Sequence, residues 1–133
     1  DKLAQSLRDA GISYHHCPEL GGLRKPKKDS VNRGWRNESF RGYADYVQTE
    51  EFQRALDALM ALASQEKTAV MCADAVPWRC HRSLIADALV SRGWDVRHIM
   101  SPEKATPHVL TSFAHVEQGR LTYPKPTDSP LLF

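Results

Sequence analysis

The residues best suited to chemistry gather in one stretch, MCADAVPWRCHRSLIADAL, from Met71 to Leu89. A cysteine in this stretch could act as a nucleophile or redox thiol once it is ionised. The histidine could serve as an acid or base, the arginines could hold an anion, and the aspartate could orient one of them. The candidate catalytic residues are therefore Cys72, Asp74, Cys80, His81 and Arg82.

The predicted elements around this stretch support a binding site. The stretch begins at the end of a predicted buried strand, residues 68–73, and enters a predicted helix near Cys80. Ligands in open α/β sheets bind where strands end and helices begin, and a helix N-terminus attracts anions and favours a thiolate. A cation is unfavourable in a first helical turn. We therefore expect Arg82 to turn back toward Asp74 or a bound anion.

A structural interpretation of the same residues stays open. Cys72 could be a small buried core residue, and Cys80 could pack against Leu84 one helical turn later. The arginines stand too far from Cys72 for a cysteine-dependent phosphatase or sulfurtransferase loop. Structural zinc sites commonly use cysteines about two to four residues apart, which these are not. A three-ligand catalytic metal site that uses Cys72, Cys80 and either His81 or Asp74 stays a minor alternative, and the sequence identifies no metal and no cofactor. His98, near the end of a predicted strand, is interpreted as a hydrogen-bonded structural histidine.

A second cluster, the basic loop (residues 24–41), contains seven basic and two acidic residues, whereas the rest of the chain is net negative. Interleaved cations and aromatic rings can bind single-stranded nucleic acid through phosphates and stacked bases. The structural alternative is a solvated loop, above all for Lys25, Lys27 and Lys28. The candidate substrate-binding residues are Trp35, Arg36 and Arg41 from this loop, together with Trp78.

Hydrophobic spacing predicts helices at residues 3–10, 40–47, 49–63 and 80–92, and short apolar runs predict strands at 12–16, 68–73 and 94–100. Residues 109–113 and a hairpin over 114–124, with Gly119 at its turn, close the predicted fold. The order strand, helix, strand over residues 68–100 predicts a right-handed βαβ unit. We therefore expect an α/β fold, with a mostly parallel sheet flanked by helices.

The length of the chain predicts a single domain, residues 1–124, with a tail at 125–133. The 133 residues are 41% hydrophobic and 26% charged, which argues against wholesale disorder. The net charge of +2 identifies neither a nucleic-acid nor a membrane partner. No apolar run approaches the roughly 20 residues that span a bilayer. Three cysteines without framework spacing favour a reduced, cytoplasmic protein.

Residues 71–99 resemble the domain of unknown function 488 family. The signature is a strand with a cysteine, an acidic residue, Cys-His-Arg opening a helix, and a strand ending in His-Ile; it falls here on Cys72, Asp74, Cys80, His81, Arg82 and His98–Ile99. Asp74 stands where glutamate is usual. Residues 11–22, 40–47 and 119–124 match as well. The resemblance implies that one or two sheet strands precede Asp1, with an arginine that belongs to the same pocket.

These observations predict an enzyme of a thiol-dependent or anion-binding kind at the Cys-His-Arg site. Its expected ligand is small and anionic, with a phosphate-bearing or nucleotide-like substrate as the leading class. The alternative is a non-catalytic nucleic-acid-binding or regulatory module that uses the basic loop. No membrane partner is expected.

Overall fold

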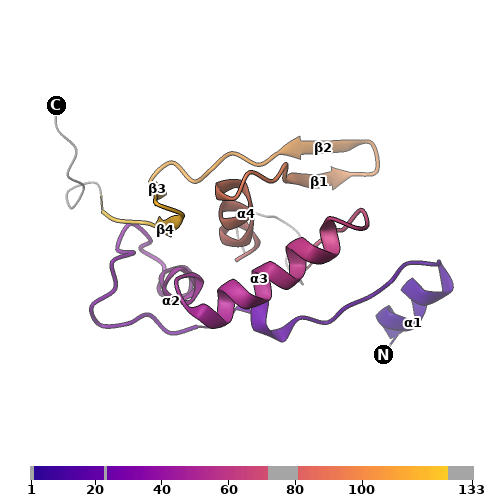
Figure 1. Cartoon of the computed structure of the whole chain (residues 1–133), viewed down its shortest axis with the longest axis horizontal. Coiled ribbons are helices and arrows are strands. Elements are labelled where there is room, and N and C mark those ends of the chain that lie inside the picture. Colours follow the sequence, from indigo (N-terminus) through magenta and orange to yellow (C-terminus); the bar gives the residue numbers. More distant parts are fainter. Residues whose placement is uncertain (1, 23, 72–80, 126–133) are drawn as a thin grey trace.

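The computed structural model describes residues 2–22, 24–71 and 81–125 (Figure 1). Its helices are α1 (Lys2–Asp9), the short 3₁₀ helix η1 (Pro18–Leu20), α2 (Glu38–Val47), α3 (Glu50–Ala63) and α4 (Arg82–Ser91). Its strands are β1 (Arg97–Ser101), β2 (Lys104–Pro107), β3 (His115–Glu117) and β4 (Arg120–Thr122). Across these ranges, no helix is both long and apolar enough to cross a membrane.

The four predicted helices are confirmed, because their signals are local. The Asn37 side chain accepts hydrogen bonds from the Ser39 and Phe40 N–H groups at the start of α2. Thr49, the predicted cap, accepts one from the Phe52 N–H at the start of α3. Gly93 follows α4 with a φ of 88°, a conformation that favours glycine and ends a helix.

The predicted mostly parallel sheet is wrong. β1 pairs with β2 and β3 pairs with β4, both antiparallel, as two separate two-stranded sheets. Residues 68–71, the described part of the expected central strand, form no strand and are exposed, and residues 12–16 form none either. β1 meets its partner after a tight turn at Pro102 and Glu103, which costs less loop-closure entropy than a parallel crossover.

The predicted C-terminal hairpin is confirmed. His115 pairs with Thr122 and Glu117 with Arg120, so the turn lies at Gln118 and Gly119. Both turn residues have positive φ, 50° and 80°, which a tight hairpin turn requires and glycine readily adopts. The hairpin thereby brings Leu121 and Tyr123 into the core.

The core lies between α2, α3 and α4, and the C-terminal hairpin closes one end of it (Figure 1). Its largest fully buried apolar side chains are Tyr43, Tyr123, Phe52, Leu56, Leu84 and Val47. In contrast, α1 stands apart from this helical layer and buries no residue. Packing of helix on helix therefore replaces the expected sheet as the source of the hydrophobic core.

The basic loop is irregular up to Asn37, as predicted, and its last residues form the first turn of α2. Its anchor is Asp45 on α2, which accepts hydrogen bonds from the Lys27 N–H (2.8 Å), the Ser30 hydroxyl (2.6 Å) and the Asn32 amide (2.7 Å). The loop crosses α2 so closely that a Cβ at Gly42 would lie 1.9 Å from the Arg24 carbonyl oxygen. The loop is therefore held by specific contacts.

Candidate acid–base site

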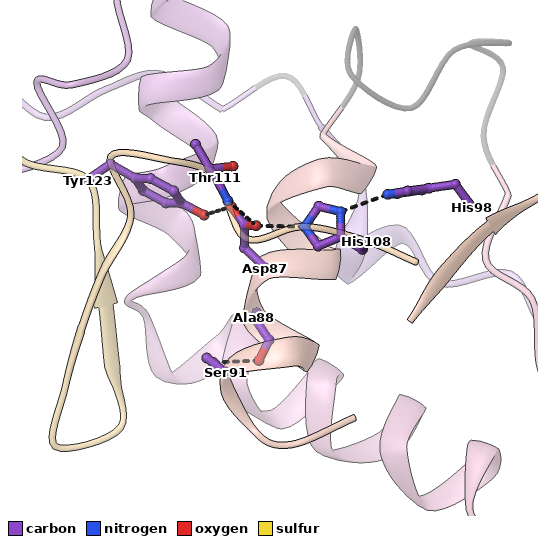
Figure 2. Close-up of polar contacts among 7 residues, drawn as sticks. All are labelled: Asp87, Ala88, Ser91, His98, His108, Thr111 and Tyr123. Carbon is purple, nitrogen blue, oxygen red and sulfur yellow. Dashed lines mark hydrogen bonds and ion pairs between the residues drawn. The ribbon is translucent and has the colours of Figure 1, made fainter. Parts of the chain in front are cut away.

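The centre of the site is Asp87, which α4 carries into the core with no solvent exposure. A buried carboxylate is costly unless its oxygens accept hydrogen bonds. Oδ1 accepts from the Thr111 N–H (3.0 Å) and lies 2.7 Å from Nε2 of His108. Oδ2 accepts from the Tyr123 hydroxyl (2.7 Å). Figure 2 shows these three partners converging on the carboxylate.

A second histidine extends the chain of contacts. Nδ1 of His108 lies 2.7 Å from Nε2 of His98, and the two rings meet edge to face at 75° (Figure 2). His98 lies in β1, and His108 directly follows β2, where its N–H donates to the Val96 carbonyl. The β1–β2 hairpin therefore positions both rings and delivers them to Asp87. His98 is hydrogen-bonded, as the sequence predicted.

The chain of contacts ends on the wall of a pocket of about 440 Å³. Its wall combines the two histidines, the hydroxyl residues Ser83, Thr106 and Thr111, and the apolar residues Trp35, Met100 and Val109. The indole N–H of Trp35 is buried and has no hydrogen-bond partner among the described residues. Pockets of this size hold small molecules.

The electrostatics of the pocket favour a neutral His98. Burial lowers the pKa of His98, and the nearby charges of His108 and Arg82 lower it further, while Asp87 opposes them. Burial and the adjacent Asp87 raise the pKa of Tyr123, so its hydroxyl keeps its proton and remains a donor. His98 can therefore accept a proton at neutral pH.

The structure places only some of the predicted site residues. Cys72, Asp74, Trp78 and Cys80 lie outside the described residues. The ring of His81 packs against Tyr43, with ring centroids 4.9 Å apart, and a Cβ at Gly22 would lie 3.0 Å from its Nδ1. His81, at the start of α4, is thus packed closely between α2 and the loop that precedes the basic loop.

Two of the predicted residues, Arg82 and Trp35, lie at or near this site. Arg82 opens α4, is half-buried and lies near enough to His98 for its charge to lower the pKa of that ring. Trp35 lines the pocket, and its carbonyl accepts a hydrogen bond from Arg41 (3.3 Å). Arg36 is exposed. Arg41 thus touches the site through the Trp35 backbone.

The family model described as domain of unknown function DUF488 matches residues 1–89. This chain belongs to the DUF488 family. No curated protein and no solved structure matches it. The DUF488 match includes Asp87 and Arg82 but ends before His98, His108 and Tyr123. The match therefore covers the carboxylate of the site and leaves both of its histidines outside.

Sequence reasoning on this DUF488 chain missed Asp87, His108, Thr111 and Tyr123. One signal was present: Asp87 is a charged residue within an otherwise apolar helical run, three residues after the buried Leu84. Its partners are far away in the sequence, so nothing local identifies them. Within the described ranges, no group of three or more His, Cys, Asp and Glu side chains is arranged to hold a metal ion.

Proposed function

We propose that this protein is an enzyme that binds a small anionic, phosphate-bearing substrate in the pocket beside α4 and transfers a proton through His98. The observation that carries the proposal is the chain from the buried Asp87 through His108 to His98, which ends on the pocket wall. A carboxylate that orients an imidazole is a recurrent arrangement for general acid–base catalysis. Here the second imidazole, that of His98, places the reactive nitrogen at the pocket wall, where the ligand is proposed to bind.

The anionic class of substrate rests on Arg82 and on the hydroxyl residues of the pocket wall. Arg82 is the arginine whose charge lowers the pKa of His98, and hydroxyl residues line the pocket beside that ring. A guanidinium binds phosphate oxygens through charge-assisted hydrogen bonds. A pocket of about 440 Å³ fits a phosphomonoester or a mononucleotide better than a polymer.

The thiol part of the proposal assigns Cys72 or Cys80 as a nucleophile, with Asp74 and His81 as supporting groups. Arg82 directly follows that stretch of chain, and a neighbouring guanidinium favours a thiolate. Trp78 and Arg36 are proposed to contact the remainder of the substrate. An enzyme that acts through His98 alone would not need either cysteine.

Titration with orthophosphate and with AMP, followed by NMR, tests binding. The indole N–H signal of Trp35, on the pocket wall, should shift, whereas that of Trp94, outside the wall, should not. Arg82→Gln should weaken binding by about tenfold, the value of one charge-assisted hydrogen bond. Arg92→Gln, at the other end of α4, is the matched control and should bind like the wild type. Equal shifts of both indoles would contradict the pocket assignment.

Turnover of p-nitrophenyl phosphate and AMP tests catalysis. Removing a general acid or base typically lowers a rate by about 10²–10⁴-fold, so His98→Gln should do the same. His115→Gln is the matched control. His115 is exposed, and its ring contacts the Glu117 carboxylate, away from the pocket wall. A His98→Gln protein with the wild-type rate would refute the acid–base role.

Iodoacetamide labelling across a pH series, read by peptide mass spectrometry, tests the thiol role. The exposed Cys17 in the same chain serves as the reference for an ordinary thiol. Cys72 or Cys80 should be labelled faster than Cys17 at low pH if it is a catalytic thiolate. If neither cysteine reacts faster than Cys17, the acid–base proposal stands without the thiol.

A nucleic-acid-binding module remains the second candidate, because the basic loop exposes Lys25, Lys27, Lys28, Arg33 and Arg36. Against it, Trp35 packs against Phe40 and Phe113, with ring centroids 5.1 and 4.9 Å away, so its ring is engaged with the core. Binding of short oligonucleotides should fall steeply with salt and disappear when Lys25, Lys27 and Lys28 become alanine. Absence of binding at low salt would exclude this candidate.

A further inference from the structure

Tyr123 holds the innermost end of the histidine chain. Its hydroxyl donates to Oδ2 of Asp87, and the Thr111 N–H donates to Oδ1. Its backbone N–H donates to Oδ1 of Asn32 (2.9 Å), and its ring packs against Trp35 and Phe113. The hydroxyl is therefore fixed by contacts at both the backbone and the ring.

We propose that Tyr123 is a positioning residue that sets the direction of proton transfer through the two histidines. By donating to Asp87, it keeps the carboxylate in its acceptor-only form, because a protonated carboxyl would need a lone pair from one of its partners. His108 must then present its Nε2–H to Asp87 and its bare Nδ1 to His98. His98 must donate its Nε2–H to His108, which leaves its own Nδ1 as the proton acceptor.

The proton balance of the step follows from this order. A substrate gives its proton to Nδ1 of His98, and the Nε2 proton of His98 moves to Nδ1 of His108. His98 ends neutral, with its proton on Nδ1, and His108 ends as an imidazolium paired with the Asp87 carboxylate. The charge thus moves from the pocket wall to the buried ion pair, and the reverse step returns the proton.

The charged and titratable groups around the two histidines lie on α4, on β1 and directly after β2. Arg82 on α4 and His108 after β2 lower the pKa of His98 on β1, and Asp87 on α4 raises it. Tyr123 faces only Asp87 among them. A change at Tyr123 therefore reaches His98 through the carboxylate.

Ring nitrogen NMR of the ligand-free wild-type chain tests the direction itself, because protonated and bare imidazole nitrogens have distinct ¹⁵N shifts. At high pH both histidines should carry their proton on Nε2, with Nδ1 bare. A His98 ring that carries its proton on Nδ1 instead would overturn the proposal. This measurement needs no variant, so it holds even where substitutions destabilise the fold.

Tyr123→Phe, followed by the same NMR signals against pH, tests the role of the hydroxyl. Without that donor the Asp87 carboxylate attracts an imidazolium more strongly, so the apparent pKa of the histidine pair should rise by at least ~0.5 unit. Tyr46→Phe is the matched control: its buried hydroxyl donates to the Glu19 carbonyl, away from the histidines, and the titration should not move. An unchanged titration in Tyr123→Phe would overturn the proposal.

The inference rests on the proposed function only in one respect, that a substrate supplies the proton. If phosphate and AMP neither bind nor turn over while the ring tautomers are as stated, the proposed function fails and the positioning role stands. If ligands bind and turn over but the tautomers are reversed, the positioning role fails alone. The two sets of measurements therefore separate the two claims.

Discussion

Two buried aspartates meet the same physical requirement in different ways. Asp45 on α2 is 5% exposed and Asp87 on α4 is fully buried, and each is contacted by three hydrogen-bonding groups. The partners of Asp45 are a backbone N–H, a hydroxyl and an amide, none of which titrates near neutral pH. Among the partners of Asp87 is His108, which leads on to His98.

The difference shows what separates a structural carboxylate from a candidate catalytic one. The contacts of Asp45 end within the basic loop that it anchors. The contacts of Asp87 continue through two imidazoles to the pocket wall. Both aspartates are therefore buried and hydrogen-bonded. Of the two, Asp87 is the one connected to a pocket through titratable side chains. Structural networks also perturb ionisable groups, so the position of such a group at a cleft is what makes it a functional candidate.

The largest effect is expected when either carboxylate is removed. Asp87→Ala leaves three buried groups without an acceptor, and Asp45→Ala does the same to its own three partners. Each variant should lose about 3 kcal/mol or more of unfolding free energy, measured by urea denaturation.

The same pair of variants should differ at the pocket. Under conditions where both remain folded, Asp87→Ala should change the ring ¹⁵N signals of His98, whereas Asp45→Ala should leave them close to those of the wild type. If Asp45→Ala changes the His98 ring as much as Asp87→Ala does, the two networks are not distinct and the comparison fails.

A smaller effect is expected in the pH dependence of stability. The pKa of His98 is lowered in the folded chain, so the unfolded chain takes up the proton first as the pH falls below about 6.5. His98 should therefore reduce stability as the pH falls from there toward its folded pKa. The loss should stay well below ~1 kcal/mol, because the partly open ring is screened by solvent.

Urea denaturation of wild type, His98→Gln and His115→Gln at several pH values measures this contribution. His98→Gln should flatten that part of the stability curve, and His115→Gln, an exposed histidine, should not. If the stability of the wild type relative to His98→Gln rises as the pH falls through this window, the pKa of His98 is raised by the fold.

The helices and the C-terminal hairpin of this chain could be predicted from local signals. The sheet could not, because strand pairing depends on residues that are distant in the sequence. Thr49, Gly93 and Gly119 act on residues within one turn of themselves, so their roles can be derived from the sequence. Residues 68–71 have the apolar composition of a buried strand, but composition does not supply a neighbouring strand. Only the fold decides whether such a run is paired, and here it is exposed.

The candidate site divides in the same way. The sequence drew attention to Arg82 and Trp35, because a cation at a helix start and an aromatic residue in a basic loop are locally unusual. It interpreted His98 as structural, because its hydrogen-bond partner is reached only when β1 and β2 pair. Asp87 and Tyr123 are 36 residues apart and meet only when the C-terminal hairpin closes the core.

The smallest effect concerns the link between the two aspartates. Asn32 donates to Asp45 through its amide and accepts from the Tyr123 N–H, and Tyr123 donates to Asp87. The two networks therefore share one rigid connection, and loss of one carboxylate should alter the support of the other. A double-mutant cycle of Asp45→Asn and Asp87→Asn should give a coupling of about 0.5 kcal/mol, the low end for residues in one network.

The matched cycle pairs Asp45→Asn with Asp57→Asn. Asp57 lies on the surface of α3, where its partly exposed carboxylate contacts Arg92, so the same chemical change is made outside the connection. That cycle should be additive within the error of unfolding measurements. A coupling between Asp45 and Asp87 no larger than in the matched cycle would mean that Asn32 and Tyr123 hold each carboxylate separately. The basic loop and the histidine pair would then be neighbours whose contributions to the free energy of unfolding are independent.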